Sequence, residues 1–280
     1  MDKHYLIGAF SKGALAQTYL DSLAVVSDQV EPIFLQYLNK EGSFDSVSLP
    51  AHAKLIKVKK AYPGNTGKHK DFRELLSPLL VRDAWCLFTD MHDVVFQAPL
   101  PPFPDTQILL ASEGKIFKDV PYWQEMFPDD VMSLEIYNVG CFAMKRDTLL
   151  AFWDELYAEW MQFHSWYKTA HIPRFGNGDN FPFNIPFHDH VRVEMAVMFN
   201  SHYDTLIYNR FIRKHRRTEL PHLFGCYAYQ VDQGIIEQYQ NQLYRAGQLV
   251  SIAHYNGSTD TNLVRKEDHV ISTSTDERRA

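Results

Sequence analysis

The stretch "LFTDMHDVVF", residues 87–96, indicates both the fold of this chain and where its chemistry lies. An apolar run ends at Thr89, the carboxylates Asp90 and Asp93 follow with His92 between them, and the chain then becomes apolar again. A short, bounded apolar run is typical of a buried strand. Because open parallel sheets bind ligands beyond the carboxyl ends of their strands, we expect Asp90 to lie at a binding edge.

Short apolar runs alternate with longer segments of helical periodicity on both sides of this stretch. The expected strands are HYLIGAF, EPIFLQYL, AKLIKVKK and WCLFTD, and the expected helices between them are ALAQTYLDSLAVVS and KDFRELLSPLLVRD. Beyond the prolines of FQAPLPPFPDT, QILLASEG is expected to form one more strand, and a long helix is expected from Asp147 to about Trp166. We expect residues 172–190 to form a loop. The pattern predicts an α/β fold with a mostly parallel central sheet flanked by helices.

Length and composition are those of one globular domain. The chain has 280 residues, of which 45% are apolar and 22% charged. We expect a single domain over residues 1–260 and a polar tail over residues 261–280. The net charge of −6 argues against nucleic acid as the partner. No apolar window of about 18 residues predicts a membrane span. The basic run at residues 210–217 leaves peripheral membrane contact open, although a solvated helix face is the more common outcome.

Three cysteines, Cys86, Cys141 and Cys226, lie far apart in apolar segments and show no CxxC spacing. This pattern is typical of reduced, buried thiols. It predicts a cytoplasmic location.

Two carboxylates placed so close at a strand end repel each other unless a cation or a proton lies between them. Mg²⁺ and Mn²⁺ prefer oxygen ligands, and substrate phosphates often complete their coordination. A nucleotide diphosphate fits that chemistry. The alternative is a turn in which Asp90 caps the following segment and Asp93 is solvated, and an isolated DxxD motif favours that alternative.

The order of motifs along residues 55–260 resembles the glycosyltransferase A-type fold, most closely the glycosyltransferase domain of the procollagen lysyl hydroxylase and collagen glucosyltransferase family. The family's strand ending in FTD plus a second aspartate is matched at residues 88–93, and its NxGGF-type turn is matched in part by NVGCF at residues 138–142. Its closing HxNGxT segment is matched by His254, Asn256, Gly257 and Thr259.

The resemblance implies a metal site formed by Asp90, Asp93 and His254, and the imidazole favours Mn²⁺ over Mg²⁺. Taken alone, His254 would be assigned to the core or to the surface beside a turn. The residues that the resemblance places near the nucleotide are Thr89, Lys68 or Lys70, Asn256, Gly257 and Ser258. A solvated loop around Lys68 is the alternative for the lysines.

The family's Asp-Gln pair facing the donor sugar is not matched here. The equivalent region reads HDHVRVEMAVMFN, where Glu194 with Met195 is the nearest match and Asp189 is the alternative catalytic carboxylate. Asn138, Glu113 and Glu194 are expected to contact the sugar or to flank the reaction face. His188 and His190 have no further ligand in the sequence and are expected to be structural or to contact the acceptor.

The resemblance implies a metal-dependent glycosyltransferase that moves a hexose from a UDP-sugar to a hydroxyl of a carbohydrate or glycoconjugate acceptor with retention of configuration. One rival is a nucleotidyltransferase or sugar-nucleotide hydrolase, although GAFSKGALAQ contains only Gly8 and Gly13 where a nucleotidyltransferase would have a Gly-rich signature. A second rival is a lectin-like or scaffold protein without catalysis.

Overall fold

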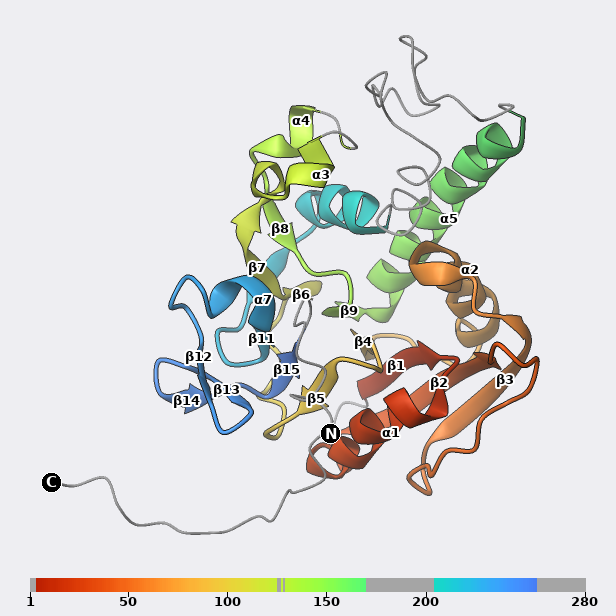
Figure 1. The fold of residues 1–280 in the computed structure, drawn as a ribbon, viewed down its shortest axis with the longest axis horizontal. Helices are drawn as coiled ribbons and strands as arrows, with labels where there is room; N and C mark the ends of the chain where they lie inside the picture. Colours follow the sequence, from red (N-terminus) through yellow and green to blue (C-terminus); the bar gives the residue numbers. More distant parts are fainter. Residues whose placement is uncertain (1–3, 125–126, 128, 170–203, 256–280) are drawn as a thin grey trace, which may run out of the picture.

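A mixed, mostly parallel sheet of seven strands forms the centre of this computed structural model, which describes residues 4–124, 127, 129–169 and 204–255 (Figure 1). The strand order is β10-β6-β9-β4-β1-β2-β3. In chain order the strands are β1 (His4–Phe10), β2 (Val30–Leu38), β3 (Lys54–Ala61), β4 (Trp85–Thr89), β6 (Ile108–Leu110), β9 (Cys141–Lys145) and β10 (Arg217–Glu219).

The sheet is parallel from β4 through β3, and β9 runs antiparallel between β4 and β6. The α/β prediction with a mostly parallel sheet is confirmed. The chain leaves β1 for β2 and β3 on one side and returns to β4 on the other. The carboxyl ends of β1 and β4 therefore flank the point where the strand order reverses, which is where open α/β sheets bind ligands.

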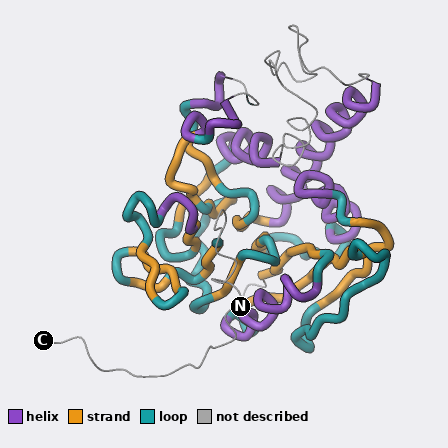
Figure 2. Tube along the Cα trace, in the orientation of Figure 1, coloured by secondary structure: helices purple, strands orange, loops and turns teal. Residues whose placement is uncertain are grey.

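Helices cover both faces of the sheet (Figure 2). Tyr5 and Ile7 of β1 pack in one cluster with α2 (Gly64–Leu76) and α5 (Arg146–Thr169), whereas Leu6 packs in the other with α1 (Gly13–Ser22). This division follows from the period of two in a strand, which sends successive side chains to opposite faces.

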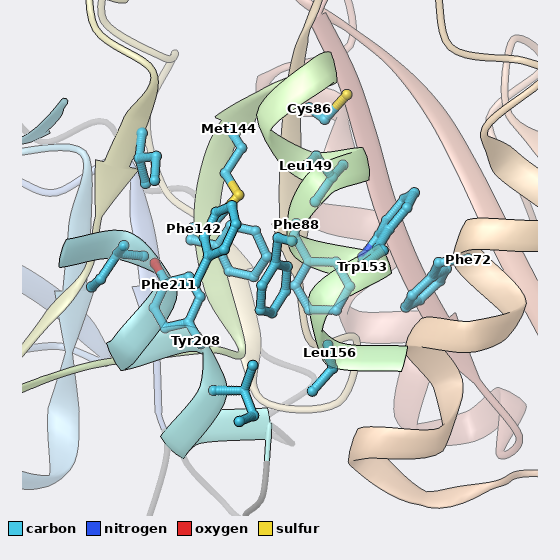
Figure 3. Packing of buried hydrophobic residues seen from close by; sticks show 14 of the residues in the cluster. Phe72, Cys86, Phe88, Phe142, Met144, Leu149, Trp153, Leu156, Tyr208 and Phe211 are labelled. Carbon is cyan, nitrogen blue, oxygen red and sulfur yellow. The ribbon is translucent and has the colours of Figure 1, made fainter. Parts of the chain in front are cut away.

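Aromatic side chains fill the space between the sheet and the helices α2 and α5 (Figure 3). Phe88 of β4 stacks on Phe142 of β9 with ring centroids 5.0 Å apart, and Phe72 stacks on Trp153 at 5.8 Å. All four side chains are fully buried. The strand that ends at Thr89, next to Asp90, is thus held by rigid packing on this face.

A second sheet, of order β11-β15-β5, joins segments from both halves of the chain. Its strands are β5 (Val94–Phe96), β11 (Phe224–Cys226) and β15 (Ile252–His254). The antiparallel pairing of β15 with β5 places His254 opposite Val94.

The remaining elements are short. They are β7 (Ser112–Ile116), β8 (Glu135–Tyr137), α3 (Pro121–Gln124), α4 (Asp129–Met132), α7 (Tyr227–Gln230), β12 (Glu237–Tyr239), β13 (Gln242–Arg245), β14 (Gln248–Leu249) and the 3₁₀ turns Leu23–Val25, Phe117–Asp119 and Ile212–Lys214. Residues 204–211 are helical.

Two predictions about secondary structure are wrong. QILLASEG is not one strand, because β6 is buried throughout and stays in the central sheet, while β7 alternates in burial and pairs with β8. The helix predicted over residues 70–83 is observed as α2 over Gly64–Leu76, so Lys68 also lies on the helix rather than on a loop before it. Its buried face closes on the aromatic core, which outweighs the weak helix propensity of its Gly-containing start.

Other predictions agree with the structure. The long helix is observed as α5, and the three cysteines are free and buried. Among the helices that the structure describes, none combines the length and apolar character needed to cross a bilayer. The predicted loop at residues 172–190 and the polar tail lie outside the described residues.

Cations of the basic run lie beside acidic side chains of the same chain. Arg210 contacts Asp130 at 3.2 Å, and Lys214 contacts Glu155 at 2.8 Å. These exposed pairs reduce the positive charge that the run offers to an anionic surface.

The hydrogen bond between Tyr19 and Thr89 ties helix α1 to the end of β4. The two hydroxyl oxygens lie 2.6 Å apart in the core. We predict that Tyr19→Phe lowers the free energy of unfolding by about 1–2 kcal/mol, because a buried hydrogen bond is lost without a change of shape. Urea unfolding measures this change. The matched change Tyr239→Phe, at a residue that is 52% exposed, is expected to have an effect below about 0.5 kcal/mol, and equal effects would contradict the prediction.

Candidate functional site

Asp90, Asp93 and His254 come together at the edge of the sheet where β4 ends. Asp90 follows β4, Asp93 precedes β5, and His254 is the last residue of β15. One ligand atom from each residue lies within 4.8 Å of the others. The three residues that the resemblance assigned to a metal site are therefore neighbours in space, although some 160 positions separate His254 from the carboxylates.

The loop from Asp90 to Asp93 is held by backbone contacts on two sides. The Asp90 amide donates to the Gly140 carbonyl at 2.7 Å, and the Tyr255 amide donates to the Asp93 carbonyl at 2.8 Å. A Cβ atom at position 140 would lie 2.4 Å from Asp90 Oδ2. The glycine of the NVGCF turn thus leaves the space that the Asp90 carboxylate occupies.

Buried His254 and partly exposed Asp93 form a charge pair with 3.2 Å between Nε2 and Oδ2. Burial alone would lower the pKa of His254, but Asp93 and, less strongly, the Cys226 thiol outweigh this effect and hold the pKa well above its usual value. Burial alone would raise the pKa of Asp93, but His254 outweighs it and lowers that pKa to about 2. The pair is therefore ionised at neutral pH.

Lys68 reaches Asp90 from helix α2. Its Nζ lies 2.7 Å from Asp90 Oδ1, and its side chain is only 4% exposed. Burial alone would lower the pKa of Lys68, but Asp90, Tyr62 and Asp204 outweigh it and raise the pKa above the usual value. Burial alone would raise the pKa of Asp90, but Lys68, together with the smaller effects of His92 and His254, keeps that pKa below its usual value. Lys68 is thus the nearest cationic partner of Asp90, as His254 is of Asp93.

The donor set fits a divalent cation. Asp93 Oδ1 is buried without a hydrogen bond from any described residue, and neither ring nitrogen of His254 makes a well-aligned hydrogen bond within the described part of the chain. Two carboxylates and one imidazole suit Mn²⁺, and Mg²⁺ less well. Asp90, Asp93 and His254 would hold the ion.

A pocket of about 280 Å³ opens beside this cluster. Its lining residues follow the carboxyl ends of three strands: Ala9, Phe10, Ser11 and Lys12 at β1, Tyr62 and Asn65 at β3, and Met91 and His92 at β4, with Ala16 from α1. It therefore lies at the point where the strand order reverses. Aromatic rings and a few polar groups line it, as in most small-molecule sites.

A further group of polar side chains lies beside Gly140. Asn138 Nδ2 donates to Glu113 Oε1 at 2.8 Å, and Lys115 Nζ lies 3.2 Å from Glu113 Oε2. Asn138 Oδ1 is buried and accepts no hydrogen bond from the described residues. Asn138 and Glu113, both predicted to contact a sugar, thus lie together, and Asn138 Oδ1 and Asp90 Oδ2 both face the position of a Cβ on residue 140.

Sequence reasoning missed Asp204. This residue is 2% exposed and lies against α2, where its amide donates to Thr66 Oγ1 at 3.3 Å and its Oδ2 lies 3.7 Å from His69 Nε2. It also contributes to the raised pKa of Lys68. The available signal was an aspartate in front of the helical pattern DTLIYNRFI.

The other predicted site residues divide into two groups. Thr89 is buried in its hydrogen bond with Tyr19, and Lys70 lies over the Tyr157 ring and 3.7 Å from Glu74. Their roles toward a nucleotide stay predictions. Seven lie outside the described residues: Asp189, Glu194, His188, His190, Asn256, Gly257 and Ser258.

Neither the protein-family models nor the curated proteins with which the sequence was compared gave a match. Function is therefore inferred from the residues and their geometry.

Metal binding is predicted to release about one proton, because His254 is protonated beside Asp93 and must become neutral to act as a ligand. Metal affinity should rise with pH through a window above the usual imidazole pKa of about 6.5. Calorimetric titration of Mn²⁺ at pH 7 in buffers of different ionisation enthalpy counts the protons. His254→Gln should bind Mn²⁺ more weakly and release none. A parent enthalpy that is independent of the buffer would contradict the prediction.

Gly140→Ala is predicted to weaken Mn²⁺ binding while the protein stays folded. The new methyl group would meet Asp90 Oδ2 at 2.4 Å and push the carboxylate from its place. Calorimetry gives the affinity, and thermal unfolding provides the control for the fold. Val139→Ala, one position earlier in the same turn, should bind Mn²⁺ as the parent does. Unchanged affinity in Gly140→Ala would show that the close approach has no role in the site.

Proposed function

We propose that this protein is a metal-dependent hexosyltransferase that takes a sugar from a UDP-sugar and transfers it to a hydroxyl of a carbohydrate or glycoconjugate acceptor. The observation that carries this proposal is the placement of Asp90, Asp93 and His254 beside a pocket at the point where the strand order reverses. A cation ligand set next to a nucleoside-sized pocket suits a nucleotide diphosphate. The resemblance in motif order supplies the glycosyltransferase A-type fold and the identity of the nucleotide.

The nucleoside would occupy the pocket between β1 and helix α2. Phe10 and Tyr62 offer ring faces to a base, and Ser11 and Asn65 offer hydrogen-bonding groups to a base or ribose. The pocket volume of about 280 Å³ lies near the lower end of small-molecule sites, which favours one nucleoside over a larger ligand. Met91 and His92 connect this pocket to the aspartates on either side of them.

The diphosphate would lie over the aspartates. A bound divalent cation supplies Lewis-acid stabilisation of the charge that develops on the leaving nucleotide. Asp90 and Asp93 orient their oxygens from a loop whose backbone is fixed on both sides, and Lys68 adds a buried cation next to it. With the cation bound, the protein would therefore offer an electropositive, preorganised site to the leaving group.

The transferred sugar would face Asn138 and Glu113. A carboxylate and an amide with an unpaired oxygen suit the hydroxyls of a hexose, since each accepts an O–H donor. The catalytic carboxylate is proposed among Glu194 and Asp189, which lie outside the described residues. Asp204 is a further candidate, because it is buried near Lys68 on a helical segment. Retention of configuration belongs to the proposal through the resemblance.

A sugar-nucleotide hydrolase would use the same donor site, so product analysis distinguishes the two activities. Transfer consumes the UDP-sugar only when an acceptor hydroxyl other than water is present, whereas hydrolysis proceeds without it. A lectin-like protein would consume none.

Asp93→Asn is predicted to abolish transfer and to remove the metal dependence of UDP binding. Loss of an outer partner of a metal ligand typically lowers affinity by about 10- to 100-fold, and loss of a ligand itself should cost at least as much. The test is calorimetry of UDP with Mn²⁺ and with EDTA, together with turnover of UDP-sugars in the presence of sugar acceptors.

Asp105→Asn provides the matched control, because its side chain is 94% exposed and lies in a loop away from the cluster. It should behave as the parent. Equal UDP affinity of the parent in Mn²⁺ and in EDTA, or full turnover in Asp93→Asn, would overturn the proposed metal bridge.

A further inference from the structure

Lys68 already occupies the carboxylate to which the proposed cation would bind. Its ammonium group lies 2.7 Å from Asp90 Oδ1, and its Nζ is 5.2 Å from the centroid of the Phe88 ring. The side chain leaves α2 among buried residues and is 4% exposed. A buried lysine with a short contact to one carboxylate has little freedom to move into water.

A divalent cation at Asp90 would place two cationic groups on one carboxylate. The repulsion between them is weakly screened, because Lys68 and His254 are both buried. The cation must either displace the ammonium group from Asp90 Oδ1 or bind with Lys68 still close by. In both cases the metal alone binds less tightly than the donor set would otherwise allow.

An anion that touches both cationic groups removes this repulsion. The pocket beside the cluster is lined by Tyr62, which precedes the helix that carries Lys68, and by Asn65 in the first turn of that helix. Phosphate oxygens of a ligand seated there would bridge a metal at Asp90 and the ammonium group of Lys68. Asp204 lies on the other side of the lysine and is held by Thr66 and the Thr205 amide.

We propose that Lys68 makes the binding of the divalent cation and of the diphosphate interdependent. Without ligands, Lys68 is the counter-ion of Asp90. When the cation binds to Asp90, the diphosphate becomes the anionic partner of Lys68. The inference rests on the proposed function and adds how the affinity for the metal depends on the diphosphate. The metal-free protein is charge-compensated, the metal alone binds weakly, and metal and diphosphate bind tightly together. Lys68 thus couples the two ligands, because it contacts Asp90 in the metal-free protein and the phosphate once both ligands are bound.

The experiment compares the parent with Lys68→Met, which keeps the length of the side chain and removes the charge. Mn²⁺ is titrated by calorimetry or by the electron paramagnetic resonance signal of free Mn²⁺, first alone, then with pyrophosphate and then with UDP, with correction for Mn²⁺ complexes in solution. In the parent, we expect saturating pyrophosphate or UDP to raise Mn²⁺ affinity by about tenfold or more. In Lys68→Met, Mn²⁺ alone should bind about tenfold tighter, and the coupling should fall toward unity.

Two further variants separate charge from shape. Lys68→Arg keeps the positive charge and should keep the coupling. Lys54→Met removes a lysine of β3 whose side chain is 54% exposed and paired with Glu31, so it should behave as the parent. Thermal unfolding of each variant reports whether the fold is retained.

The outcomes distinguish failure of the proposed function from failure of the proposed role of Lys68. A parent that binds neither Mn²⁺ nor UDP overturns the proposed function. A parent that binds both, with no coupling between them, overturns the role of Lys68 even if Lys68→Met does not fold. Weaker binding of Mn²⁺ alone by folded Lys68→Met also overturns it, because Lys68 would then only orient Asp90 for the metal.

Discussion

The site depends on one electrostatic constraint. Two carboxylates lie close together at the end of one buried strand, and their negative charges must be compensated. The ionised forms of Asp90 and Asp93 are stabilised by cations that come from distant parts of the chain, Lys68 from α2 and His254 from β15. Removing either partner would leave a partly buried charge uncompensated, which costs several kcal/mol. The packing of α2 on the aromatic core and the pairing of β15 with β5 therefore serve charge compensation as well as stability.

The same compensation makes the site able to exchange partners. A carboxylate neutralised by a lysine and another neutralised by an imidazolium form a cluster that is stable without metal, and each cation can be replaced when a stronger one arrives. Imidazole can lose its proton and become a ligand, whereas Lys68 keeps its charge and needs a new anion. Replacing His254 at Asp93 therefore depends on the loss of a proton, whereas replacing Lys68 at Asp90 depends on the arrival of an anion.

Strands and long helices were predictable because their periodicity is local. The alternation in β1 and β4 and the spacing of apolar residues in α5 are readable within each segment. The start of α2 was not, because Gly64 and Gly67 weaken its helical signal and only burial against the core overcomes it. The break between β6 and β7 was also missed, since it depends on pairing with β8, which comes later in the chain.

In the candidate site, too, some features can be predicted from local sequence and others cannot. Asp90 and Asp93 are visible as a motif, but their proximity to His254 comes from a pairing between strands far apart in sequence, and only the resemblance in motif order anticipated it. No local pattern predicts that Lys68 contacts Asp90 or that Asp204 lies near Lys68, because both contacts arise where separate elements pack against α2.

The arrangement also explains why the aspartates lie on a loop between two sheets. Residues that must change partners need room, and a strand interior gives none, because its backbone and side chains are fixed on all sides. Here β4 and β5 fix both ends of the loop, while Gly140 leaves space beside Asp90 and the pocket opens next to Met91 and His92. The carboxylates are thus held in position by their backbone, and under the proposed function this is the arrangement in which a metal would take the place of the lysine or the imidazolium.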